Sequence, residues 1–301
     1  MDVLTDALAA LRTNKPQSSL VQVSTPWGLR FSPVKGAGFH VVLQGSCWLL
    51  PPDGDPIALA PGDVVFLHEG RGHALADNPS ASLDDFRPEN FARPDPGGAE
   101  AGVTRLLCGA YGLDQSRPHP LLRDLPSVVH LPARVGRHPS LRTTIDLLGN
   151  ELEQPRPGSD AVVPALVDVL LLYILRSWYD EQDAEHRRTG WAGAFTDPGI
   201  STALEAIHAD PRHPWTLESL AGRVGMSRAV FARRFNSLVG EPPLTYVTQW
   251  RMRLAARLLR ETKLSLAAVG EQVGYTSAFA FAKAFKREFG TAPGTYRTQN
   301  R

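Results

Sequence analysis

Cysteine is scarce in this sequence, where Cys47 and Cys108 are the only two among 301 residues. Two thiols cannot build a disulfide framework, and such scarcity is typical of a reducing compartment. No apolar run reaches about 18 residues, the length that spans a bilayer, and the N-terminus is acidic where a signal peptide would be basic. We therefore expect a cytoplasmic, soluble protein that does not bind a membrane.

Signatures of catalysis are also missing from the sequence. It contains no GxSxG motif, no glycine loop that would cradle phosphate and no paired-carboxylate pattern. Nothing in these patterns requires a cofactor, so we expect no enzyme activity and no cofactor.

The net charge of +1 conceals an uneven distribution. Residues 199–301 carry 15 Lys and Arg against 7 Asp and Glu, a balance of +8, which leaves −7 for residues 1–198. Single arginines often only solvate a helix face, but the balance over this whole region favours a polyanionic partner. We expect the C-terminal part alone to bind nucleic acid.

One helix-turn-helix pattern is written twice in the C-terminal part. Ala221 precedes Gly225 by four residues, and Gly270 precedes Gly274 in the same way. A steep bend between two helices needs a residue that accepts positive φ, and a tiny residue lets the helices approach closely. In the helix after each bend, phenylalanines four residues apart share one buried face: Phe231 with Phe235, and Phe281 with Phe285.

The opposite face of each second helix combines small residues with cations. Such a face suits a helix pressed into the major groove, where bulk would clash and arginine can bond a guanine edge. The residues predicted to contact DNA are Arg228, Ala229, Ala232, Arg233, Ala278, Phe279, Ala280, Lys283, Lys286 and Arg287. A connecting helix from Pro243 to about Arg260 would hold the two units one DNA turn apart, so that one chain reads two boxes.

Three phrases in this region resemble the AraC/XylS family of bacterial transcription regulators. They are residues 250–259 (WRMRLAARLL), 273–275 (VGY) and 285–290 (FKREFG), in the family's order. The sequence departs from the family pattern at Gly270, where Ala is usual, and at Lys283, where Arg is frequent. The resemblance implies a regulator, such as an activator, that binds double-stranded DNA, forms a homodimer and contacts RNA polymerase.

The N-terminal part has the period and turn density of a small β-barrel. Strand-type runs are expected at residues 20–24, 38–44, 46–50, 57–59, 63–68 and 73–76, after an opening helix with Leu4, Leu8 and Leu11 that should pack on the barrel. Residues 79–102, rich in Pro, Asp and Gly, are expected to form a long loop.

The phrase at residues 59–67 (LAPGDVVFL) resembles the second conserved box of a cupin barrel, with Gly45 in the turn that closes the first. Residues 5–135 resemble the cupin-type sensor domain found ahead of some AraC-like DNA-binding domains. The resemblance implies a small-molecule effector in the barrel, and the interior residues expected to line its site are Phe31, His40, Val42, Trp48, Phe66 and His73.

A metal-dependent cupin enzyme would need His-x-His, then Glu, then His. The segment before Gly45 has a lone His40, with Gly38 near the place of the glutamate, and His73 alone falls where a ligand would stand. We therefore expect no metal site. A zinc or redox-sensing cluster is the alternative, formed by His40, Cys47, His68, His73 and Cys108, against a reading in which the cysteines are small core residues.

Between the two parts the sequence predicts helices at residues 141–152 and 161–183 and a linker at 185–199. The wide apolar stripe of the second helix, which includes Leu171 and Ile174, either covers the barrel or forms a homodimer seam, and the seam is preferred.

These observations predict an α+β chain: a cupin-like effector-sensing domain at 1–135, a helical dimerisation region and linker at 136–198, and an all-α double helix-turn-helix domain at 199–301. The function expected is sequence-specific transcription regulation under a small-molecule effector. The alternatives are a cupin metalloenzyme or a metal or redox sensor fused to a DNA-binding domain, and a ligand-independent architectural DNA binder. The effector, the operator and the direction of regulation are left open.

Overall fold

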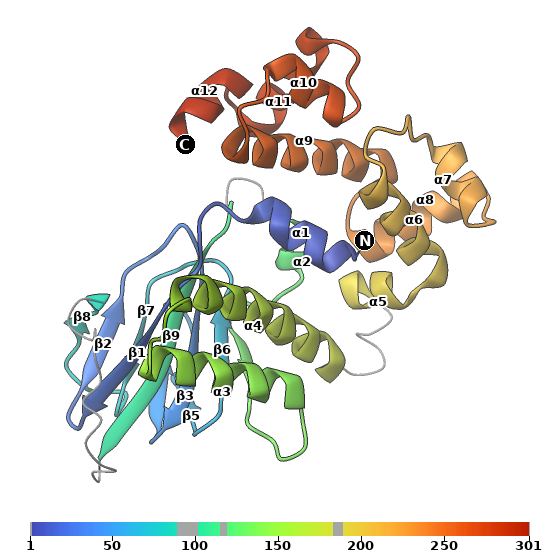
Figure 1. Cartoon of the computed structure of the whole chain (residues 1–301). Helices are drawn as coiled ribbons and strands as arrows, with labels where there is room; N and C mark the ends of the chain where they lie inside the picture. Colours follow the sequence, from blue (N-terminus) through green and yellow to red (C-terminus); the bar gives the residue numbers. More distant parts are fainter. Residues whose placement is uncertain (1, 89–101, 115–118, 183–188, 301) are drawn as a thin grey trace. The chain divides into compact units, whose positions relative to one another are not determined.

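The computed structural model describes residues 2–88, 102–114, 119–182 and 189–300 (Figure 1). Its described residues fall into two compact units. The barrel unit consists of residues 14–88, 102–114 and 125–181, and the helical unit consists of residues 2–13, 119–124, 182 and 189–300. The predicted α+β class is confirmed, but this grouping differs from the division expected at residues 135 and 198.

The barrel unit contains two five-stranded sheets in the part of the chain that the structure describes. One has the order β1 (Gln17–Ser24), β9 (Val103–Gly112), β3 (Gly36–Gln44), β6 (Val64–Leu67) and β10 (Val129–Leu131). The other has the order β5 (Ile57–Leu59), β4 (Cys47–Leu50), β7 (His73–Ala76), β2 (Gly28–Phe31) and β8 (Asp84–Asp85). Neighbouring strands are antiparallel except β2 and β8. The expected strands are all present, whereas β2, β8, β9 and β10 were not predicted, and β8 lies within the range expected to form a long loop.

The inner faces of both sheets meet in one apolar cluster. Successive side chains of a strand point to opposite faces, so Val65 and Leu67 of β6 join this cluster while Phe66 does not. Phe66 lies instead near the ring of Tyr111, whose hydroxyl donates to the carbonyl of Val167 on α4. The sheet that contains β6 is therefore apolar on both faces.

Two helices cover this sheet from outside: α3 (Pro139–Glu153) packs against β1, and α4 (Ser159–Glu181) packs against β1 and β10 (Figure 1). The stripe preferred as a homodimer seam lies in this contact, since Leu171 is 4% exposed and Ile174 is fully buried. The preferred interpretation of the stripe was therefore wrong, because a sheet that is apolar on both faces needs a cover. By length and composition alone, α4 could also cross a membrane, since an 18-residue window of it has a mean hydropathy of 1.7. Its apolar stripe, however, packs against strands of the barrel unit.

The helical unit begins with α1 (Val3–Leu11), which packs against α6 (Pro198–Ala209) and α9 (Pro243–Glu261). The opening helix was expected to pack on the barrel, and that expectation was wrong. The short α2 (Pro120–Arg123) belongs to the helical unit as well. Residues 190–196 of the expected linker form α5 (Gly190–Thr196), because Trp191 and Ala194 are buried; residues 183–188 lie outside the described chain, as do residues 89–101 of the expected long loop.

The two helix-turn-helix copies have matching geometry. The first is α7 (Leu217–Arg223) followed by α8 (Arg228–Val239), and the second is α10 (Leu266–Gln272) followed by α11 (Ala278–Phe289). Gly225 and Gly274 have φ of +67° and +84°, as the bend requires. Gly270 packs against Phe281, where an added Cβ would come within 3.2 Å. The connecting helix α9 covers the predicted range, and α12 (Pro293–Gln299) closes the unit.

Candidate nucleic-acid interface and barrel cavity

Helix α8 buries one face and exposes the predicted contact face. Ser227 caps its first turn by accepting from the backbone N–H of Val230. Phe231 and Phe235 are fully buried, with ring centroids 5.6 Å apart. Of the residues predicted on the other face, Arg228, Ala229 and Arg233 are exposed and Ala232 is half-buried.

Helix α11 repeats this arrangement with a different exposed chemistry. Its buried face consists of Phe281, Ala284 and Phe285. Phe279 is 79% exposed, an unusual state for a large apolar side chain. The other residues predicted on this helix are also exposed: Ala278, Ala280, Lys283, Lys286 and Arg287. An exposed phenyl ring among small residues and cations can contact a thymine methyl group in a major groove.

Helix α9 determines how these two faces are separated within the helical unit. It has 19 residues, which corresponds to about 28 Å at 1.5 Å per residue. Its Arg257 donates from Nε to Glu261 at 3.0 Å, so this guanidinium is already engaged by a carboxylate one helical turn away.

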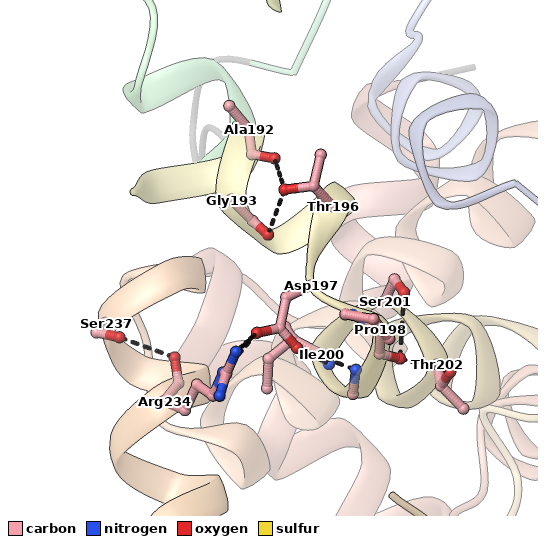
Figure 2. Close-up of polar contacts among 11 residues, drawn as sticks. Ala192, Gly193, Thr196, Asp197, Pro198, Ile200, Ser201, Thr202, Arg234 and Ser237 are labelled. Carbon is pink, nitrogen blue, oxygen red and sulfur yellow. Dashed lines mark hydrogen bonds and ion pairs between the residues drawn. The ribbon is translucent and has the colours of Figure 1, made fainter. Parts of the chain in front are cut away.

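Sequence reasoning missed an ion pair at the start of α6. Asp197 caps this helix, accepting from the backbone N–H groups of Gly199 at 3.0 Å and Ile200 at 2.9 Å. Its second carboxylate oxygen accepts from the guanidinium of Arg234 on α8 (Figure 2). The Asp197-Pro198 pair at the head of an apolar run is a capping signal, but a partner 37 residues away cannot be found from local pattern.

The barrel unit contains a cavity of about 780 Å³. Among the six residues predicted to line an effector site, Phe31, His40 and His73 line it. Val42 lies in the inner apolar cluster but does not line the cavity. Phe66 and Trp48 lie on the other faces of their strands, because the inward-pointing neighbours of Trp48 are Cys47 and Leu49.

Further residues that line the cavity were not predicted, and they come from β1, from β9, from the segments before β7 and after β8, and from the α3–α4 corner. They include Ser18, Ser19, Arg71, Phe86, Cys108, Glu151, Asp160 and Val163. Ser18 Oγ is buried without a hydrogen-bond partner among the described residues. Its hydroxyl is therefore a polar group that an occupant of the cavity could satisfy.

Four of the residues that line this cavity form a hydrogen-bonded chain: Arg71, His73, His40 and Cys108. His73 Nδ1 lies 3.1 Å from the carbonyl oxygen of Arg71, which can only accept, so this nitrogen carries the proton. In the neutral ring Nε2 of His73 then accepts from Nε2 of His40 at 2.7 Å. The other ring nitrogen of His40, Nδ1, is then unprotonated and accepts a hydrogen bond from the thiol of Cys108 at 3.1 Å.

Burial determines the protonation of this chain. Desolvation, with a smaller contribution from the charge of His73, lowers the pKa of His40 well below its ordinary value. Desolvation also lowers the pKa of His73 and raises the pKa of the Cys108 thiol far above its usual range. It raises the pKa of Cys47 to about 12. All four groups are consequently neutral near pH 7, and a protonated thiol is a poor nucleophile and a poor metal ligand.

The proposed zinc cluster does not form as a ligand set. In the described ranges no group of three or more His, Cys, Asp and Glu side chains is placed to hold a metal. The Nε2 atoms of His40 and His73 are engaged with each other, and Cys108 contacts the opposite side of the His40 ring. Cys47 belongs to the apolar cluster.

A second buried chain lies in the helical unit. The backbone N–H of Leu121 donates to His119 Nδ1 at 3.2 Å, which puts the proton of the neutral ring on Nε2. That nitrogen lies 3.3 Å from the hydroxyl of Tyr246, which in turn lies 2.8 Å from His208 Nε2. The only consistent assignment has His119 donating to Tyr246 and Tyr246 donating to His208. Asp6 Oδ2 lies 3.5 Å from His208 Nδ1.

Comparisons with known proteins agree with both halves of this description. Residues 2–180 match a family described as Cupin, and residues 220–299 match one described as Helix-turn-helix domain. The chain is 35% identical to an AraC-like transcription regulator of Streptomyces lividans, over 99% of this chain and 98% of that protein. It is 32% identical to the HTH-type transcriptional regulator AlkR of Acinetobacter baylyi over 100% of both chains.

A third relative is the RCS-specific HTH-type transcriptional activator RclR of Escherichia coli, 30% identical over 98% of both chains. Among solved structures, the DNA-binding domain of AdpA in complex with a target DNA is 34% identical. That likeness covers 35% of this chain and 95% of that one, with a TM-score of 0.33.

Proposed function

This chain belongs to the AraC-like family of DNA-binding transcription regulators with an N-terminal cupin domain, and on that premise we propose that a small molecule bound in the barrel cavity controls its activity. The observation that carries the proposal is the cavity of about 780 Å³, a volume that suits a drug-sized molecule. Apolar walls would supply affinity, and the orphaned Ser18 hydroxyl would orient one polar group of the ligand.

The donors on the cavity floor support a sensor rather than an enzyme. The ring lone pairs of His40 and His73 are both engaged, the first by the Cys108 thiol and the second by His40, so neither ring has a free lone pair for a proton or a metal ion. Burial keeps the Cys108 thiol protonated by raising its pKa. We therefore propose a predominantly apolar effector and no catalytic step. A regulator of this kind acts on chromosomal DNA, and we propose a cytoplasmic location with RNA polymerase as a further partner.

Gly38 offers a direct test of cavity occupancy. It lines the cavity, and a Cβ added there would meet nothing closer than 3.8 Å, so a side chain can project inward without backbone strain. Thermal shifts of the full chain would be screened against a panel of apolar alcohols, phenols and carboxylic acids. A compound that stabilises the wild type should lose its effect on Gly38→Leu and keep most of it on Gly38→Ala. Equal shifts for all three proteins would place the compound elsewhere and contradict the proposal.

We propose that α8 and α11 read base edges in adjacent major grooves, with Arg233 as the principal base contact of α8. Arg233 is exposed beside Ala229, whereas Arg257 is engaged with Glu261 on the connecting helix. Arg233→Ala should cost about 1–3 kcal/mol on the cognate duplex and relax the preference at one or two base pairs. Arg257→Ala should weaken all sequences alike and lower the salt slope by at most about one.

Titrations of both variants against a cognate and a scrambled duplex at several salt concentrations decide between these roles. The cognate duplex would be selected from a random pool by the wild-type chain. An equal loss on both duplexes for Arg233→Ala would make that residue a backbone anchor and overturn the assignment.

We also propose a homodimer, through the outer side of α4 rather than its buried stripe. On α4, Val162 and Val169 are 42% and 38% exposed and Tyr173 is half-buried, and Leu147 of α3 is 52% exposed. Val169→Asp should dissociate the dimer in sedimentation, while Thr143→Asp on exposed α3 surface should not. Leu171→Asp should instead destabilise the barrel unit, because it would bury a carboxylate. A monomeric wild type would end the proposal.

A further inference from the structure

We propose that Asp197 is a positioning residue, which fixes the orientation of α8 for base reading by holding Arg234. The inference rests on the proposed reading of DNA by α8. It adds a residue that contacts no DNA itself but determines where Arg233 points.

The carboxylate of Asp197 joins two helices at once. One oxygen caps α6 through two backbone N–H groups, and the other accepts from the Arg234 guanidinium (Figure 2). The Asp197 side chain is only 6% exposed, whereas that of Arg234 is 53% exposed. A carboxylate removed from water and held by two backbone donors has a fixed position, so it can act as an anchor for the guanidinium.

The position of Arg234 on α8 makes this anchor sensitive to rotation. Consecutive helical residues are about 100° apart around the axis, so Arg234 points to α6 when its neighbour Arg233 points away to solvent. A roll of α8 that redirected Arg233 would pull Arg234 out of its ion pair. The pair therefore opposes this motion.

A second contact at the same corner restrains the start of α8. Gly199, in the first turn of α6, lies under Met226 of the helix-turn-helix bend, and an added Cβ there would come within 2.6 Å of the Met226 Cε atom. Helix α5 also packs against α8. The α5–α6 corner thus contacts the bend through Gly199 and the recognition helix through Asp197.

The second copy of the repeat supplies an internal comparison. Phe231 and Phe235 correspond to Phe281 and Phe285, so the counterpart of Arg234 is Ala284, which is 8% exposed and belongs to the buried face of α11. A helix-turn-helix of this design therefore folds without an arginine at that place. The Asp197–Arg234 pair is an addition specific to the first copy, which points to control of orientation rather than to a general requirement of the fold.

The test uses the full chain with Asp197→Asn, Arg234→Met and the double variant. Asparagine retains the capping oxygen, so α6 is preserved while the charge that holds Arg234 is lost. We expect each single variant to reduce the ratio of cognate to scrambled affinity about tenfold, the effect of one misplaced base contact. The double variant should lose no more than either single one, because both remove the same interaction.

Electrostatics alone predicts the opposite sign for one of these variants. Asp197→Asn makes the chain more positive, which by itself would strengthen binding to any duplex. A weaker cognate complex with an unchanged salt slope would therefore support positioning. In an Arg233→Ala background, Asp197→Asn should have no further effect on the cognate ratio.

Three outcomes would overturn the inference: wild-type discrimination in Asp197→Asn, additive losses in the double variant, or a salt slope lowered by about one in Arg234→Met with equal weakening of both duplexes. The last would make Arg234 a phosphate contact. Failure of the proposed base reading is separate, because it appears as an unchanged cognate ratio in Arg233→Ala alone. Thermal unfolding of each variant shows whether the chain is still folded. Arg234→Lys, which keeps a cation for Asp197, should partly restore the cognate ratio if the orientation of α8 is what the other variants disturb.

Discussion

Tyr246→Phe tests the buried chain of the helical unit. Removing the hydroxyl leaves two buried groups without partners, the Nε2–H of His119 and the Nε2 lone pair of His208. Both rings are almost fully buried, so water cannot replace the lost partner. An unsatisfied buried polar group costs about 1–3 kcal/mol, and we expect the free energy of opening to fall by about 3 kcal/mol in total.

The repeat offers a matched control in Tyr296, the counterpart of Tyr246 fifty positions later. Its hydroxyl accepts from Arg260 Nη1 at 2.7 Å, and that guanidinium also donates to the carbonyls of Ala10 and Arg12. Tyr296→Phe removes the acceptor of one N–H group of Arg260, whose guanidinium is half-buried and keeps its two carbonyl partners. We therefore expect the free energy of opening to fall by only about 1 kcal/mol.

Native-state hydrogen exchange measures both losses locally, which matters because a chain with two compact units need not unfold in one step. Amides of α6 and α9 should lose protection in Tyr246→Phe, while those of the barrel strands serve as an internal reference. If Tyr246→Phe kept wild-type protection, or if Tyr296→Phe cost more, the proton assignment along the chain would be wrong.

Two other predictions concern pH and backbone strain. Desolvation lowers the pKa of both His119 and His208, so the unfolded chain binds more protons below its ordinary histidine pKa of about 6.5. The stability that these two neutral histidines contribute should therefore be complete above that pH, and the free energy of unfolding should fall as the pH decreases from about 7 to 5. Denaturant titrations that give the same free energy of unfolding across this range would contradict this. Gly225→Ala should cost about 1 kcal/mol, since φ is positive but an added Cβ meets nothing within 4 Å. Gly274→Ala should cost more, because its Cβ would lie 3.1 Å from backbone atoms of Arg212; thermal unfolding that ranks them in reverse would refute the steric argument.

The two helix-turn-helix motifs could be predicted from sequence because their signals are local. The glycines at the bends and the phenylalanines four residues apart act within one or two turns of helix. Exposure of the predicted DNA-facing residues follows directly from that periodicity, since a helix that buries Phe231 and Phe235 must expose Arg233.

The residues that line the barrel cavity were harder to predict because strands such as β4 and β6 are apolar at every position, so the alternation of side chains along the strand does not show which face points inward. Trp48 and Phe66 looked equivalent to Phe31 in sequence, yet only Phe31 points to the cavity. The contact of His40 with Cys108 depends on the pairing of β3 with β9, where these residues are direct partners although they are 68 positions apart. No local pattern specifies such a register.

The assignment of α1 and α2 to the helical unit changes what counts as a transferable part of this protein. A fragment of residues 190–301 contains both helix-turn-helix motifs, yet it would lack the Ala10 and Arg12 carbonyls that hold Arg260 and the His119 ring that meets Tyr246. Grafting the helical unit onto a different N-terminal domain would require residues 2–13 and 119–124 to be transferred with it, although they flank the barrel strands in sequence. Evolution by exchange of whole domains would meet the same obstacle, so the barrel unit and the helical unit of this chain are expected to diversify together.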